Sequence, residues 1–181
     1  FCCKYLHPDQ TQKPKLLEEI QRPLTEKCTT VAWLNRQTVN EAEQRLYDIM
    51  THNMQSAYNL VDYVGNLKSG LRMCRLGSNQ LPMYTQPDWR YFWQQADIRK
   101  ELARGYAKVG ELARALGVRL SFHPGQFTVL ASDNDDIVER SIDISKCDNN
   151  IYFLSSLLRS YRGYLEAIFP NQGCEPATLA S

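Results

Sequence analysis

A histidine that closes a short alternating segment is the first candidate for chemistry in this chain. The segment from Val118 to Phe122 alternates apolar and polar side chains, which predicts a β-strand. His123 follows, and the next two residues are Pro-Gly, a pair that ends regular strand pairing. A strand end holds an imidazole rigidly, and imidazole is a good ligand for transition-metal ions. The alternative is an ordinary turn histidine whose ring is satisfied by a neighbour.

Two other sets of side chains could support the same chemistry. Gln126 and Phe127 follow the Pro-Gly turn, which places an amide and an aromatic ring beside the histidine. Arg75 and Ser78 close another predicted strand, where they could hold a phosphate group. Each has a structural alternative, because Phe127 precedes an apolar run and could pack in the core, and Arg75 could belong to a buried ion pair.

The elements that must position these residues alternate between strands and helices. Thr38 and Glu41 form a capping-box pattern that begins a long helix, and Gly65-Asn66 ends it. A strand is predicted over 71–76, an amphipathic helix over 98–116 is closed by Gly117, and the next strand covers 118–122. This alternation favours parallel βα units.

The flanking segments follow less regular patterns. Residues 1–6 predict a first strand and residues 9–15 a loop. The aromatic segment 87–93 is expected to cap or line one end of the sheet, and a helix is expected over 135–144. Asp135 and Asp136 suit the beginning of that helix, where negative charge is favoured.

Composition narrows the class of protein without naming a partner. The chain has 181 residues, enough for one domain, and 43% of them are hydrophobic, so it can bury a sizeable core. Its net charge of +1 shows no overall basic excess of the kind that marks many nucleic-acid-binding proteins. The six cysteines lack CxxC spacing, which favours a reduced compartment. We therefore predict a cytoplasmic protein, nucleoid-associated if the source is bacterial, with an organelle or the nucleus left open.

Several segments together resemble the UV-damage DNA endonuclease family. The most specific is His-Pro-Gly-Gln-Phe at 123–127, which is similar to the family's His-Pro-Gly-Gln-Phe/Tyr signature. The segment Arg-Leu-Gly-Ser at 75–78, followed by Pro82, and the helix Ile-Val-Glu-Arg-Ser-Ile at 137–142 also resemble family motifs, in the same order along the chain. Phe1-Cys2 looks like the end of the family's first barrel strand. The resemblance covers residues 1–144.

This resemblance implies a TIM-barrel fold and a metal-dependent repair nuclease. A complete barrel takes about 250 residues, so we expect a partial barrel that holds only the N-terminal βα units. His123 would be a catalytic metal ligand, with Mn²⁺ as the expected cofactor. Gln126, Phe127 and Phe1 would contact the lesion in UV-damaged double-stranded DNA, and Arg75 and Ser78 would hold the backbone. The implied reaction is hydrolysis of a phosphodiester bond on the 5′ side of a UV photoproduct.

The chain departs from the family after residue 144. No histidine follows His123, whereas the family's later strands carry further histidines and carboxylates. We therefore divide the chain into 1–144, the N-terminal part of the barrel, and 145–181, a divergent helical segment and tail that a truncation or a frameshift would explain. Two other functions stay open at this point. One is a metal-dependent barrel of the abasic-site endonuclease or sugar-isomerase type, and the other is a non-catalytic module that binds damaged DNA.

Overall fold

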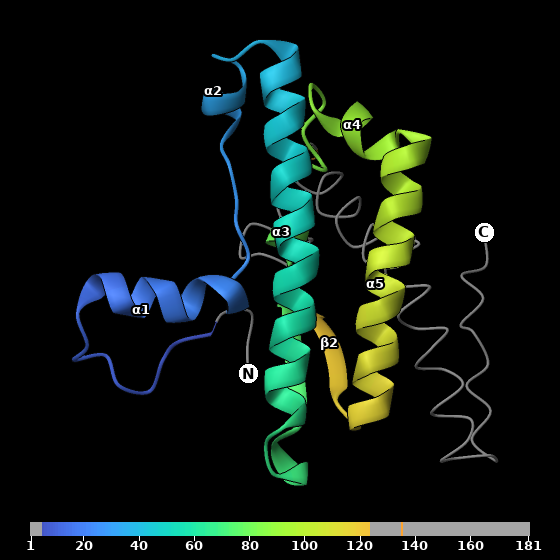
Figure 1. Ribbon diagram of the computed structural model, residues 1–181. Coiled ribbons are helices and arrows are strands. Elements are labelled where there is room, and N and C mark those ends of the chain that lie inside the picture. Colours follow the sequence, from blue (N-terminus) through green and yellow to red (C-terminus); the bar gives the residue numbers. More distant parts are fainter. Residues whose placement is uncertain (1–4, 124–134, 136–181) are drawn as a thin grey trace, which may run out of the picture.

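The computed structural model describes residues 5–123 and residue 135 (Figure 1). The elements in chain order are α1 (Pro14–Gln21), η1 (Arg22–Leu24), α2 (Val31–Leu34), α3 (Val39–Gly65), η2 (Ser69–Leu71), β1 (Met73–Gly77), η3 (Ser78–Gln80), α4 (Arg90–Gln94), α5 (Ala96–Leu116) and β2 (Arg119–His123). No helix among these residues is long and apolar enough to cross a membrane.

The longest helix, α3, begins where the capping box predicts. The Thr38 side chain accepts from the backbone N–H of Glu41, and the Glu41 carboxylate accepts from the backbone N–H of Thr38. Seven apolar residues that recur at three- and four-residue steps along the helix are buried, and Met54 on the same face is half-buried; the seven are Leu46, Ile49, Met50, Ala57, Leu60, Val61 and Val64. The helix ends at Gly65, as predicted.

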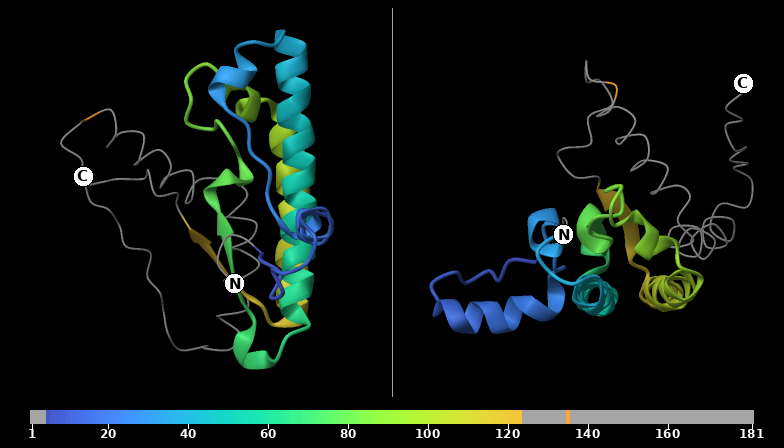
Figure 2. Two further views of the ribbon diagram at one scale, coloured as in Figure 1. Left: turned by 90° about the vertical axis from the view of Figure 1, so that its left-hand side faces the viewer. Right: turned by 90° about the horizontal axis from the view of Figure 1, so that it is seen from above.

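The two strands are parallel, and α5 connects them. Arg75 pairs with Ser121 and Gly77 with His123, so the two strands end at the same level. Gly117 adopts the left-handed conformation, with φ of 64°, and this lets the chain leave α5 and enter β2. Both long helices lie on the same face of the strand pair (Figure 2). The prediction of parallel βα units is therefore confirmed.

The core lies between the two long helices and the helix-facing side of the strands. Cys74 and Leu76 of β1 are buried there, together with Tyr106 of α5, which is fully buried. Between them in β1, Arg75 is exposed. The aromatic segment joins this core, since Trp93 is buried and its indole N–H donates to the backbone O of Pro82 over 3.0 Å. It thus fixes the loop that follows β1.

The opposite end of the helix pair is held by one arginine. Arg72 precedes β1, and its Nε donates to the backbone O of Leu67, just beyond α3, over 3.0 Å. Its Nη1 donates to the backbone O of Leu116, the last residue of α5, over 2.9 Å. A cation is favoured at helix C-termini, where carbonyl groups lack partners within the helix. Arg72 therefore ties both helix ends to the beginning of β1.

Several predictions need correction. The predicted loop 9–15 ends early because α1 begins at Pro14, and Pro is favourable in the first turn of a helix. Leu71 lies in η2 and β1 runs on to Gly77, while β2 begins at Arg119 and includes His123. Tyr5 and Leu6 are not in a strand, and the remainder of the strand predicted over 1–6 lies outside the described residues. The predicted helix 135–144, apart from Asp135, and the segment 145–181 also lie outside them.

Candidate functional site

The parallel register brings two predicted site segments to one edge of the sheet. Gly77 ends β1 and pairs with His123, which ends β2. Ser78 begins η3 directly after β1, and Arg75 lies two residues before the strand end. Because the carboxyl ends of parallel strands meet at one edge, the segments that carry His123 and Ser78 lie side by side. Ligand sites in parallel α/β folds form at this edge.

The structure locates some of the predicted site residues, and others lie outside its described part. Arg75 is exposed, which contradicts its alternative interpretation as a member of a buried ion pair. The ion pair found among the described residues is the exposed Arg22–Glu18 pair. Ser78 and His123 are placed by their backbone positions in η3 and β2. The other predicted lesion contacts, Gln126, Phe127 and Phe1, lie outside the described residues.

A carboxylate that the sequence did not single out also lies at this edge. Glu26 belongs to the extended segment between η1 and α2 and is half-buried. A Cβ atom added to Gly77 would lie 2.6 Å from Glu26 Oε1, so the carboxylate occupies the space that a side chain at 77 would fill. Glu26 therefore packs against the last residue of β1, whose partner in the sheet is His123.

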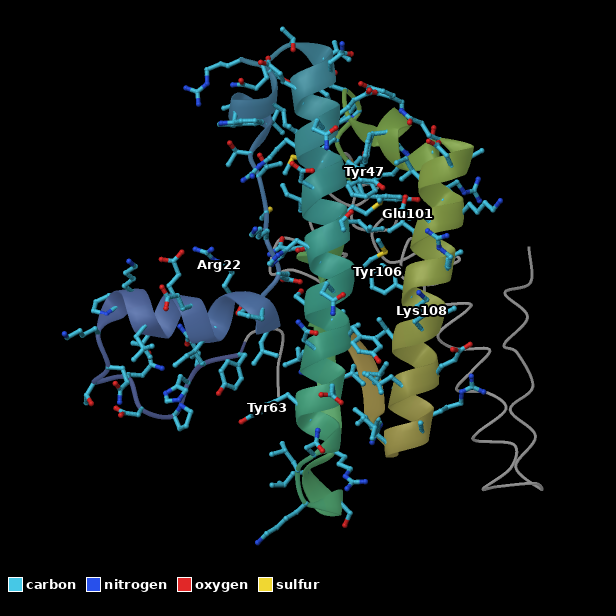
Figure 3. The ribbon with its side chains drawn as sticks, in the orientation of Figure 1. Arg22, Tyr47, Tyr63, Glu101, Tyr106 and Lys108 are labelled. Carbon is cyan, nitrogen blue, oxygen red and sulfur yellow. The ribbon has the colours of Figure 1, made fainter. Side chains whose placement is uncertain are left out.

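The Glu26 carboxylate is held by a chain of side-chain hydrogen bonds. Gln80 Nε2 donates to Glu26 Oε2 over 2.9 Å, and the Tyr106 hydroxyl donates to Gln80 Oε1 over 2.8 Å. Gln80 and Tyr106 are both buried. Figure 3 shows Tyr106 on α5, level with the middle of the two long helices. The helix core thus fixes the amide that in turn orients the carboxylate.

A buried asparagine on α3 fixes the backbone around Glu26. Asn53 is 0% exposed, and its Oδ1 accepts from the backbone N–H of Lys27 over 2.7 Å. Its Nδ2 donates to the backbone O of Lys27 over 3.0 Å and to that of Asn79 over 2.9 Å. One side chain therefore joins the extended segment to η3. This explains how a segment without regular secondary structure keeps a defined path across the sheet edge.

Burial sets the protonation behaviour of this network. It raises the pKa of the Glu26 carboxyl above its ordinary value, although hydrogen bonds from Gln80 and Asn79 oppose that shift. Burial, reinforced by the charge of Glu26, also raises the pKa of the Tyr106 hydroxyl, so Tyr106 keeps its proton and acts as the donor to Gln80. None of the causes that shift the pKa of Glu26 is a cationic side chain.

A cavity of about 520 Å³ reaches Glu26 from the side of α1. Its lining also includes Thr25, Lys27 and His52. His52 Nε2 lies 3.0 Å from the backbone O of Thr25, and burial lowers the pKa of its imidazole. His52 thus packs against the segment before Glu26. The cavity leaves one side of the Glu26 region open to small solutes.

The side chains at the sheet edge supply some, but not all, of the ligands that a divalent ion needs. The described residues contain no group of three or more His, Cys, Asp or Glu side chains able to hold a metal. They do place a half-buried carboxylate against the strand end that pairs with His123. Carboxylate oxygen suits Mn²⁺ and other hard ions, and imidazole nitrogen suits transition-metal ions such as Zn²⁺ and Fe²⁺. His123 and Glu26 are accordingly the candidates in this part of the chain.

Comparison with known proteins connects this geometry to a family. Residues 13–154 match the family model described as UV-endonuclease UvdE. The chain belongs to this family. A relative from Nostoc sp., named UV DNA damage endonuclease, is 30% identical over 120 residues, or 66% of this chain and 35% of that protein. A Bacillus anthracis protein of the same name is 28% identical over 116 residues, or 64% of this chain and 34% of that protein.

A solved UvdE structure shows the same fold. The crystal structure titled SacUVDE superposes with a TM-score of 0.54 at 23% identity, and the match covers 75% of this chain and 40% of that one. The prediction of a partial TIM-type barrel is confirmed by this similarity. The chain spans about a third of the length of the curated UvdE relatives that it matches.

Proposed function

We propose that this chain is the N-terminal part of a metal-dependent DNA repair endonuclease that nicks the backbone on the 5′ side of UV photoproducts. The observation that carries the proposal is the register of β1 and β2. It places the Arg-Leu-Gly-Ser segment beside His123, the first residue of the His-Pro-Gly-Gln-Phe segment, at one sheet edge. Membership of the UvdE family supports DNA with UV damage as the substrate.

The residues then take separate roles. His123 holds a divalent ion, Mn²⁺ in our proposal. Arg75 and Ser78 contact the DNA backbone, whose phosphates attract cationic and hydroxyl donors. Gln126 contacts exposed base edges, and the rings of Phe127 and Phe1 fill the space beside unstacked bases. When bound, the metal would lower the pKa of a water molecule and polarise the scissile phosphate.

Recognition of damage is tested with two labelled duplexes that differ only in one cyclobutane pyrimidine dimer. Fluorescence anisotropy in EDTA measures binding without hydrolysis, and we expect tighter binding of the damaged duplex by the 181-residue chain. Gln126→Ala should reduce this preference. Lys68→Ala serves as the control, because Lys68 lies beyond the end of α3 and away from the sheet edge. Equal affinity for both duplexes would contradict the proposed substrate.

Hydrolysis is tested separately on a denaturing gel with Mn²⁺. The proposal expects a nick on the 5′ side of the dimer from the protein that contains the whole barrel, and loss of that nick in its His123→Ala variant. A whole-barrel protein that prefers damaged DNA yet never nicks it would instead support the non-catalytic damage-binding alternative.

A further inference from the structure

The cavity of about 520 Å³ beside α1 is a separate feature from the sheet edge. It is bounded by α1, η1, the extended segment after η1 and His52 of α3, and no described residue of β1, η3 or β2 lines it. Two cationic side chains, Arg22 and Lys27, belong to its lining, together with neutral side chains and two carboxylates. Fixed cations around an open cavity attract anions, provided that the carboxylates do not cancel their charge.

The two carboxylates of the lining are each engaged elsewhere. Glu18 forms an exposed ion pair with Arg22, with 2.8 Å between Oε1 and Nη2. The Glu26 oxygens face η3 and β1, because Oε2 accepts from Gln80 and Oε1 lies where a side chain at Gly77 would be. Burial also raises the pKa of the Glu26 carboxyl, which favours its uncharged form.

Positive charge therefore prevails at the wall that His52 forms. Burial lowers the pKa of the His52 imidazole, and the charges of Lys27 and Arg22 lower it further, while the hydrogen bond of the ring to the backbone opposes the shift. No carboxylate is among the causes of this shift, although Glu18 and Glu26 line the same cavity. Lys27 itself is exposed and forms no ion pair within the described part of the chain.

The stretch 22–27, which carries both cations, is fixed along α3, and Figure 1 shows it beside that helix. Three α3 side chains hold the backbone of alternate residues of the stretch; the pairs are Asn59 with Pro23, His52 with Thr25, and Asn53 with Lys27. Asn53 also donates to the backbone O of Asn79 in η3, so one side chain anchors both Lys27 and the loop after β1. The backbone around the two cations is thus ordered before a ligand binds, which reduces the entropy cost of binding.

We propose that this cavity binds a phosphate group, which Lys27 and Arg22 hold by their charges. Both cations are common phosphate ligands, Lys as a point charge and Arg as a planar fork. The favoured source is a phosphate of the DNA backbone, because Glu26 packs against the end of β1 and so places Lys27 near the sheet edge. Free phosphate is the other source. In so far as the phosphate belongs to DNA, this inference rests on the proposed function, and it adds contacts beyond Arg75 and Ser78.

The first test uses inorganic phosphate as the probe and the 181-residue chain. Thermal unfolding is measured with increasing phosphate, against chloride at equal ionic strength, and the rise of the midpoint gives the apparent affinity. Lys27→Gln removes one cation and keeps the backbone bonds to Asn53. Glu18→Gln removes the carboxylate that competes for Arg22. Lys68→Gln is the matched control, because Lys68 is exposed and lies outside the cavity.

We expect Lys27→Gln to bind phosphate about two- to fivefold more weakly than the wild type, as for an exposed charge pair. Glu18→Gln should bind it more tightly, and Lys68→Gln should match the wild type. These opposite changes separate a site from the general stabilisation that phosphate gives to folded proteins. The inference is overturned by a wild type that responds to phosphate no more than Lys27→Gln does, by weaker binding in Glu18→Gln, or by an equal loss in Lys68→Gln.

The second test distinguishes the two sources of the phosphate. Binding of damaged and undamaged duplexes is measured by fluorescence anisotropy in EDTA at several salt concentrations. If the DNA backbone occupies the cavity, Lys27→Gln weakens binding of both duplexes by the same factor and lowers the slope of log affinity against log salt by about 0.9. An unchanged slope together with weaker phosphate binding assigns the cavity to free phosphate. Equal affinity of the wild type for the two duplexes overturns the proposed function and leaves the phosphate site standing.

Discussion

The clearest stability prediction concerns Asn53, the α3 side chain that joins the Glu26 segment to η3. Asn53→Ala removes three hydrogen bonds of 2.7, 2.9 and 3.0 Å and a weaker fourth of 3.4 Å to Gln80 O, and it leaves the Lys27 N–H and three backbone carbonyls without that partner. At about 1 kcal/mol for each bond, with a small cavity in addition, the free energy of unfolding should fall by about 3–4 kcal/mol. With a slope of about 2 kcal/mol/M in urea, the unfolding midpoint falls by roughly 1.5–2 M.

The assay is urea unfolding followed by circular dichroism, with Asn59→Ala as the control. Asn59 lies on the same helix, and its Nδ2 donates to Pro23 O in η1, just before that segment, over 3.0 Å, but it is half-buried and this bond lies at an exposed position. Its loss should cost less than about 1 kcal/mol. Amide hydrogen exchange at Lys27 should also speed up in Asn53→Ala. If both variants shift the midpoint equally, Asn53 does not hold the segment as described.

Three further predictions concern the neighbouring residues. Gly77→Ala should destabilise the fold by about 1 kcal/mol, because its Cβ would displace Glu26 Oε1 and weaken the bond from Gln80. Adding Glu26→Ala should recover part of this loss in a double-mutant cycle of urea midpoints, and strict additivity would refute the contact. Tyr106→Phe should cost about 1–2 kcal/mol in the same assay because it leaves Gln80 Oε1 without its donor, and an unchanged midpoint would count against that bond. Since burial raises the pKa of Glu26, the folded state holds that proton more tightly than the unfolded chain. Its contribution to stability is therefore fully present below the ordinary pKa of 4.5 and is lost as the pH rises through the folded pKa. Urea midpoints measured from about pH 4 to about pH 8 should fall more for the wild type than for Glu26→Gln, and parallel curves would contradict the raised pKa.

The parts of the fold that could be predicted are those whose causes are local in the sequence. Thr38 and Glu41 are three residues apart, and their reciprocal hydrogen bonds form as the capping box predicts. Gly117 closes α5 because its left-handed conformation is needed there. The short helix α1 was missed because it has only eight residues and fully buries none of them, although Leu17 and Ile20, three residues apart, are half-buried and Ile20 packs against the core. Its best signal was Pro14 in the first turn.

The residues of the candidate site also divide into those that the local sequence predicts and those that it does not. The position of the histidine at the end of β2 could be predicted because its strand and the Pro-Gly pair lie within six residues of it in the sequence. Glu26 could not, since it stands in no motif and its partner Gln80 is 54 residues away. Its burial depends on how α3, η3 and the extended segment pack together, and no short pattern in the sequence encodes that arrangement.

The position of Arg72 has a consequence for how this fold can change over evolution. Arg72 joins the C-terminal ends of α3 and α5 at the end of the sheet opposite to Gly77 and His123. Arg72, which holds the two helix ends, and the sheet edge that carries the candidate site are therefore separated by the length of the strands. Substitutions in the loops after β1 and β2 can alter what the edge binds while the helix ends stay anchored, as in barrel folds where one face carries function and the other stability. Such a division lets a lineage acquire new specificity without first having to find compensating mutations in the framework.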